Sequence, residues 1–89
     1  MNHQTSIIKL EILGIGSLRY LSVKQNLLAA LQIMQLDIPV NEVKDIDKIL
    51  EGNLIGIPAL RVNNTILFQN EVPSIEDIQQ SLNEFLHPE

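Results

Sequence analysis

The sequence contains no cysteine, and this absence excludes disulfide bonds, thiolate metal ligands and every thiol-based redox step. Aromatic side chains make up only 3% of the chain, too few for a platform on which nucleic-acid bases could stack. Six lysines and arginines face eleven aspartates and glutamates, which gives a net charge of −5. A partner held through its phosphate backbone needs a basic surface, so we expect no nucleic-acid partner.

Long hydrophobic runs are missing as well. No stretch approaches the ~18 consecutive apolar residues that span a membrane, so we expect no membrane partner. Residues 1–6 contain no basic region, and no apolar segment follows them that would complete a secretion signal. These absences predict a cytoplasmic location.

Sequence motifs for metals and cofactors are also absent. The two histidines, His3 and His87, lie near opposite ends of the chain and share no metal-binding spacing with a carboxylate. The segment Gly14-Ile15-Gly16 lacks the third glycine of a dinucleotide-binding loop. We therefore expect no metal and no cofactor, and we assign no residue a catalytic role.

What the sequence does contain is enough for one small domain. Its 89 residues fall far below the roughly 250 at which chains divide into several cores, so we expect a single domain over residues 1–89. Hydrophobic residues make up 45% of the chain, which is sufficient for a packed core.

Hydrophobic periodicity predicts the first two elements. Alternating apolar residues over 7–13 predict a strand, which the glycines that follow bring to an end. Apolar residues at three- and four-residue steps over 18–36 predict a helix, which ends before Pro39. Its apolar stripe is wider than one core-facing side, through Leu18, Leu21, Leu28 and Ile33. The helix is therefore either nearly buried or has a second partner surface, and a homodimer is one form that the second surface could take.

The second half of the chain predicts five further elements. A strand over 40–43 precedes a short helix that begins after Asp45 and ends at Gly52 in the left-handed conformation. Strands over 59–62 and 65–68 form a hairpin, and a last helix follows Ser74. The order β-α-β-α-β-β-α predicts an α/β fold, in which helices flank a four-stranded mixed sheet.

This order resembles the thioredoxin and glutaredoxin fold, and the motifs resemble the small bacterial and archaeal thioredoxin-like domains called redox-active disulfide proteins. Three segments carry the resemblance: Ile12-Leu13-Gly14-Ile15-Gly16, Gly56-Ile57-Pro58-Ala59-Leu60 and Val72-Pro73-Ser74-Ile75-Glu76-Asp77-Ile78. The resemblance implies a cis peptide bond before Pro58. It also implies that Ile57 presents its backbone N–H and C=O to an extended peptide, as in β-strand addition.

The chain departs from this family where the family carries its Cys-x-x-Cys motif. The four positions here read Ser17-Leu18-Arg19-Tyr20. In the family the first cysteine attacks as a thiolate and the second resolves the mixed disulfide. A serine hydroxyl and a tyrosine ring can do neither, so the dithiol chemistry of the family is not carried over.

Each residue of the altered motif has a structural and a functional interpretation. Ser17 is either an N-cap, worth about 1 kcal/mol, or a hydroxyl that stabilises a bound thiolate, as in some glutathione transferases of this fold. Tyr20 belongs either to the core or to a recognition surface. We expect Leu18 to be exposed and Arg19 to be solvated.

The leading hypothesis is a redox-inactive thioredoxin-like domain that acts as a binding or interaction module for a protein or peptide. Its binding site would comprise Ser17, Leu18, Arg19, Tyr20, Ile57 and Pro58. The alternative hypothesis is an enzyme that binds glutathione or another thiol and uses Ser17 to stabilise the thiolate.

Overall fold

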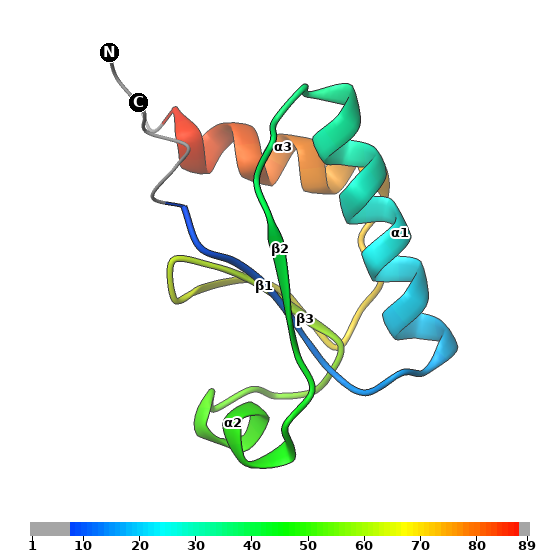
Figure 1. Ribbon diagram of the computed structural model, residues 1–89, viewed down its shortest axis with the longest axis vertical. Coiled ribbons are helices and arrows are strands. Elements are labelled where there is room, and N and C mark those ends of the chain that lie inside the picture. The colour runs from blue at the N-terminus through cyan, green and yellow to red at the C-terminus, as the bar shows by residue number, and fades with distance from the viewer. Residues whose placement is uncertain (1–7, 88–89) are drawn as a thin grey trace.

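A four-stranded mixed sheet forms the centre of the computed structural model, which describes residues 8–87 (Figure 1). The strands are β1 (Leu10–Leu13), β2 (Val40–Val43), β3 (Ala59–Val62) and β4 (Thr65–Gln69), in the order β2-β1-β3-β4. β1 pairs in parallel with β2 and antiparallel with β3, and β3 pairs antiparallel with β4. The predicted element order and mixed sheet are confirmed. The predicted start of the first strand at Ile7 lies outside the described residues, as do His3 and the rest of residues 1–6, in which we expected no secretion signal.

Three helices cover the sheet: α1 (Leu18–Ile33), α2 (Ile46–Glu51) and α3 (Ile75–Leu86). Leu10 and Ile12 of β1 pack in the main core with residues of α1 and α3, whereas Leu13 packs in a smaller cluster with Ile49 of α2. Alternate β1 side chains therefore serve opposite faces of the sheet. In Figure 1, α2 lies at the same end of the molecule as the start of α1. None of the described helices is long and apolar enough to cross a membrane.

The end of α1 differs from the prediction. We predicted a helix to Leu36, but α1 ends at Ile33. Gln35 takes the left-handed conformation with φ 58°, and the Leu36 N–H donates to the Leu31 carbonyl at 2.9 Å. This is a Schellman ending, which normally uses glycine at the left-handed position. Apolar periodicity continues to Leu36, so the pattern alone does not reveal the reversal at Gln35.

Replacing Gln35 by glycine should stabilise the fold by about 0.5–1 kcal/mol. The left-handed conformation costs a residue with a side chain about 1–2 kcal/mol, and the greater freedom of glycine in the unfolded chain offsets part of the gain. Urea denaturation followed by circular dichroism measures the change. Gln32→Gly is the matched control inside α1 and should destabilise by about 1 kcal/mol. A Gln35→Gly variant less stable than the wild type would contradict this account of the helix ending.

Asparagines adopt the positive φ angles at two of the predicted turns. Gly52, expected in the left-handed conformation, is right-handed with φ −79°, and the next residue, Asn53, takes φ 55° instead. That prediction is wrong because the chain reverses one residue later, at a residue type that tolerates positive φ. In the β3–β4 hairpin, Asn63 and Asn64 have φ 48° and 70°, which confirms the predicted tight turn.

The sheet face that α2 covers carries a buried ion pair beyond the end of that helix. Glu11 is 5% exposed and accepts a hydrogen bond from Arg61 Nε at 2.7 Å, while Lys9 Nζ lies 3.7 Å from its other oxygen. The hydrogen bond from Arg61 outweighs burial and lowers the pKa of Glu11 below its usual value. Glu11 is the one buried charged side chain among the described residues, and Arg61 supplies the opposite charge and the hydrogen bond that compensate its burial.

Candidate functional site

The start of α1 and the loop before β3 lie next to each other, although they are far apart in the sequence. Gly14, between β1 and α1, is the point of closest approach. A Cβ atom added there would lie 3.5 Å from Pro58 Cα and 2.9 Å from Tyr20 Cδ1. Only glycine allows this approach, so Gly14 lets the connection to α1 pass between the tyrosine ring and the proline loop.

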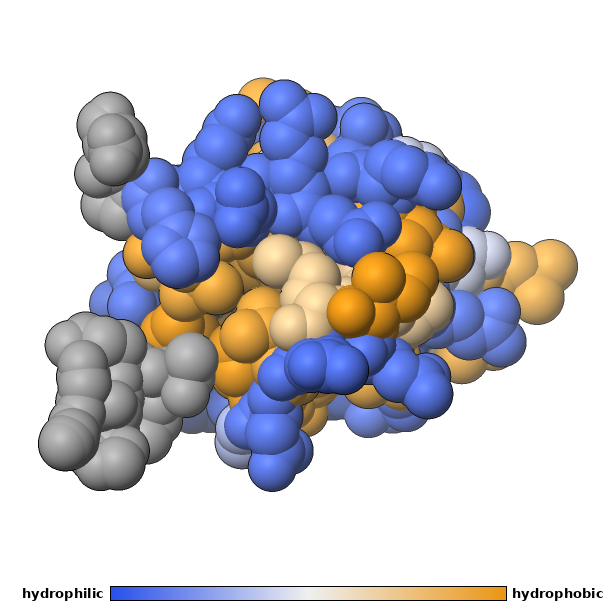
Figure 2. All heavy atoms as spheres, turned by 90° about the horizontal axis from the view of Figure 1, so that it is seen from above, coloured by the Kyte–Doolittle hydropathy of each residue, from blue (hydrophilic) through white to orange (hydrophobic). Residues whose placement is uncertain are grey.

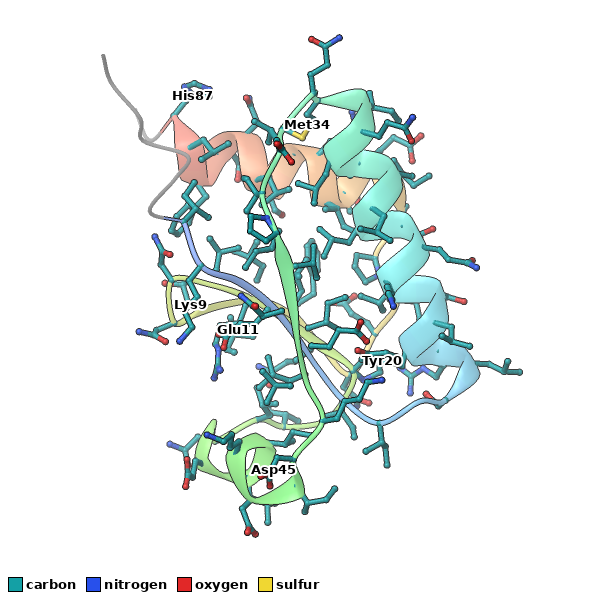
Figure 3. The ribbon with its side chains drawn as sticks, in the orientation of Figure 1. Lys9, Glu11, Tyr20, Met34, Asp45 and His87 are labelled. Atoms are coloured by element: carbon teal, nitrogen blue, oxygen red, sulfur yellow. The ribbon has the colours of Figure 1, made fainter. Side chains whose placement is uncertain are left out.

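The residues of the altered motif are divided between the surface and the core. Ser17 and Arg19 are exposed, and Leu18 is 82% exposed. Tyr20 is 1% exposed and belongs to the main core, with its side chain between α1 and the sheet (Figure 3). Tyr20 therefore does not form part of the surface that we predicted over residues 17–20, because its ring packs inward.

Tyr20 is held in the core by a polar network that the sequence did not reveal. Its Oη donates a hydrogen bond to the Glu42 carboxylate of β2. Lys24 Nζ lies 2.9 Å and Lys44 Nζ 3.5 Å from the Glu42 oxygens, and Lys44 Nζ also lies 5.7 Å from the centre of the Tyr20 ring. The position of the family's second cysteine is thus occupied by a side chain with its own structural role.

This network shifts the pKa of both hydrogen-bonded groups. The hydrogen bond from Tyr20, assisted by Lys24, lowers the pKa of Glu42 to about 2. Burial is the main cause that raises the pKa of Tyr20, and the hydrogen bond to Glu42 adds to it. The phenol therefore stays protonated at neutral pH and acts as a hydrogen-bond donor.

Tyr20 should not ionise in the native protein near pH 10, where a free tyrosine titrates. It is the only tyrosine and the chain has no tryptophan, so ultraviolet absorbance at 295 nm reports this one group. Because the folded-state pKa lies above the unfolded-state value, stability should be complete below pH 10 and should fall as the pH rises beyond it. Glu42→Gln should lower the native pKa towards 10, and urea-unfolded protein is the reference. A native midpoint near 10 would show that the phenol is free.

The N-terminus of α1 has the electrostatic character of an anion-attracting helix start. Ser17 caps the helix, because its Oγ accepts a hydrogen bond from the Tyr20 N–H at 3.1 Å. The first turn contains no acidic residue and includes Arg19. Free backbone N–H groups at such a helix start carry a partial positive charge. The structural interpretation of Ser17 as an N-cap agrees with this geometry.

A thiol introduced at Ser17 should therefore have a lowered pKa. The chain offers a matched control, because Ser74 caps α3 in the same way, with its Oγ accepting from the Asp77 N–H at 3.0 Å. The first turn of α3 carries Glu76 and Asp77, which oppose a thiolate. We expect a pKa of roughly 7 or below in Ser17→Cys, and a value at least about one unit higher in Ser74→Cys. Thiolate absorbance at 240 nm against pH measures both, and equal values would contradict the account of the α1 start.

Ile57 lies in the loop that leads to β3, directly before Pro58. The peptide bond between Ile57 and Pro58 is cis. The loop is tied to β4, because the Asn70 N–H donates to the Pro58 carbonyl at 2.9 Å and the Ile55 N–H donates to Gln69 Oε1 at 2.8 Å. Among residues 8–87, no hydrogen bond uses the backbone N–H or C=O of Ile57. The loop is thus fixed while these two groups are available.

Apolar side chains are exposed at both ends of α1. Leu18, Leu21 and Leu28 are 82%, 46% and 47% exposed, as the width of the apolar stripe suggested. Figure 2 looks onto the end of the molecule at which α1 terminates, and apolar atoms gather there between polar ones. Ile33, at that end of the helix, is 60% exposed. The homodimer that we expected from such a surface stays a prediction.

The described residues hold no arrangement suited to a metal ion. Between residues 8 and 87, no three histidine, aspartate or glutamate side chains gather. Within that range, the site offers unpaired backbone groups at Ile57, the positive start of α1 and exposed apolar surface.

The sheet order, the helices on its two faces and the proline loop beside the start of α1 define a thioredoxin-like α/β domain. No family model matches the chain. It is similar to a thioredoxin of Methanothermobacter thermautotrophicus, at 28% identity over 76 residues that cover 85% of this chain and 99% of the relative. A thioredoxin of Methanocaldococcus jannaschii is 24% identical over 80 residues, which cover 90% of this chain and 92% of the relative.

The chain is thus a distant homologue of archaeal thioredoxins, and the predicted thioredoxin-like fold is confirmed. It differs from a dithiol oxidoreductase in having no cysteine at any position. The absence of both thiols is consistent with a degenerate active site on a retained scaffold.

Proposed function

We propose that this chain is a redox-inactive thioredoxin-like module that binds an extended segment of a protein partner at the loop before β3. The observation that carries the proposal is the state of Ile57, whose backbone N–H and C=O have no partner among residues 8–87 while the loop around them is fixed. Strand addition needs only such main-chain groups, so the loss of cysteine does not remove it.

The neighbouring surface supports this proposal. Leu18 is 82% exposed at the start of α1, and the loop that carries Ile57 and Pro58 lies close to that start. Burial of an exposed leucine against a partner is favourable by roughly 25 cal/mol per Å² of apolar surface. We define the peptide surface as Ser17, Leu18, Arg19 and Ile57, with the buried Pro58 behind it.

Titration of ¹⁵N-labelled protein with the peptide acetyl-Lys-Ala-Ser-Ala-Lys-amide tests the proposal. We expect amide shifts at Ile57 and along the start of α1, with weak affinity. Leu18→Ser should weaken binding at least fivefold, whereas Leu28→Ser, at the other end of the exposed leucines of α1, should leave it unchanged. Shifts that spare Ile57, or equal losses in the two variants, would count against the proposal.

The enzyme alternative makes a different prediction. In that case Ser17 would stabilise the thiolate of glutathione at the positive start of α1. Calorimetric titration with glutathione should then show millimolar or tighter binding that disappears in Ser17→Ala. The proposed module predicts no such heat, and a heat that depends on Ser17 would favour the enzyme.

A further inference from the structure

An apolar pocket of about 480 Å³ adjoins Ile57. Residues of α2 and of the loop that leads to β3 form its walls, through Ile46, Leu50, Leu54, Ile55 and Ile57. Of these, Ile55 is 82%, Leu50 70% and Ile46 52% exposed, so residues 8–87 leave much of this apolar surface uncovered. Gly56 packs closely against Asn70, because a Cβ added at Gly56 would lie only 2.7–2.9 Å from the Asn70 side chain.

We infer that this pocket is a side-chain subsite that receives a large aliphatic side chain of the extended segment bound at Ile57. The inference rests on the proposed function and adds the kind of partner sequence that the site selects. Ile57 joins the two features, because its backbone is available for pairing and it also lines the pocket. Side chains of an extended peptide alternate between two sides, so a segment paired at Ile57 presents every second side chain in one direction.

Charge around the pocket points to a basic partner segment. Asp45 and Asp47 flank the pocket residue Ile46 in the sequence, whereas Glu51 and Lys48 line a separate hollow with Lys9 and Arg61. Among residues 8–87, neither Asp45 nor Asp47 takes part in an ion pair. Opposite charge on a partner improves recognition and association rate at the rim of an apolar contact. The occupant is therefore a protein segment in which aliphatic residues are flanked by lysine or arginine.

Three peptides separate the contribution of the leucine side chains to binding from that of the lysine charges. The leucine probe is acetyl-Lys-Leu-Ser-Leu-Lys-amide, the alanine probe replaces both leucines by alanine, and the acidic probe replaces both lysines by glutamate. At low salt the leucine probe should bind at least tenfold more tightly than the alanine probe and at least threefold more tightly than the acidic probe. Leu50→Ser and Ile55→Ser alter exposed side chains, and each should remove most of the leucine advantage without changing affinity for the alanine probe. Leu28→Ser is the matched control and should leave the advantage intact.

The outcomes distinguish the pocket from the site next to it. If the leucine and alanine probes bind with equal affinity and both shift the Ile57 amide, the pocket inference fails while the proposed function stands. If neither probe binds, both fail. A leucine advantage that is lost in Leu28→Ser but kept in Leu50→Ser would overturn the inference, because the side chain would then lie on α1. An acidic probe that binds best would overturn the assignment of a basic partner.

Discussion

Replacing Tyr20 by alanine should destabilise the domain by about 3–5 kcal/mol, the usual result of removing a buried aromatic ring. The ring is 1% exposed, packs against the connection at Gly14 and donates a hydrogen bond to Glu42. A domain of this size has a total stability of roughly 4–13 kcal/mol, so this loss is a large share of it. Urea denaturation monitored by circular dichroism gives the value.

Tyr20→Phe is the control that separates the ring from the hydroxyl. It keeps the buried ring and removes only the hydrogen bond to Glu42, so we expect a loss of about 1 kcal/mol. Glu42 retains Lys24 and Lys44 as partners in that variant. If Tyr20→Ala cost no more than Tyr20→Phe, the ring would not be the core element described above.

Tyr20 has a structural role at the position that corresponds to the second cysteine of the Cys-x-x-Cys motif. The second cysteine position of the family is not vacant here but holds a side chain on which the core depends. Cysteine in place of Tyr20 would leave a cavity in the core beside Gly14 and would remove the hydrogen bond to Glu42. Ser17, by contrast, is exposed, and its structural role is limited to capping α1.

Arg61→Met is expected to have the second largest effect, a loss of about 3 kcal/mol at pH 7. The variant leaves Glu11, only 5% exposed, without its main hydrogen-bond partner, and an uncompensated buried charge is strongly unfavourable. In the wild type the lowered pKa of Glu11 contributes stability above about pH 4.5 that is lost as the pH falls. In the variant, protonation relieves the penalty, so the difference between the two proteins should shrink on acidification.

The double variant Glu11→Leu/Arg61→Met is the control for this prediction. Replacing both members of a buried ion pair by apolar side chains is often neutral or stabilising. Urea denaturation at pH 7 and pH 4 compares the three proteins. A single variant as stable as the wild type at pH 7 would mean that solvent, and not Arg61, compensates Glu11.

Local sequence patterns were sufficient to predict the elements whose signals lie within a few residues. The caps at Ser17, Asp45 and Ser74 and the paired asparagines of the hairpin act through hydrogen bonds and backbone preferences within one turn. The end of α1 was missed because glutamine is not a typical left-handed residue, and the apolar period continues past it.

The parts of the site that were missed depend on tertiary placement. The network of Tyr20 with Glu42 joins a helix to a strand, and only the position of β2 beside α1 brings the two together. The four-residue spacing of Tyr20 and Lys24 was the one local signal for it. The apolar pocket likewise forms only when α2 and the loop before β3 are folded against each other, so no sequence period marks it.

The most direct test of the central claim is an NMR structure of the chain bound to the leucine probe. The account predicts an extended peptide whose main chain hydrogen-bonds to the N–H and C=O of Ile57, with one leucine side chain among Leu50 and Ile55. A peptide that sits elsewhere, with the Ile57 amide still open to solvent, would contradict it.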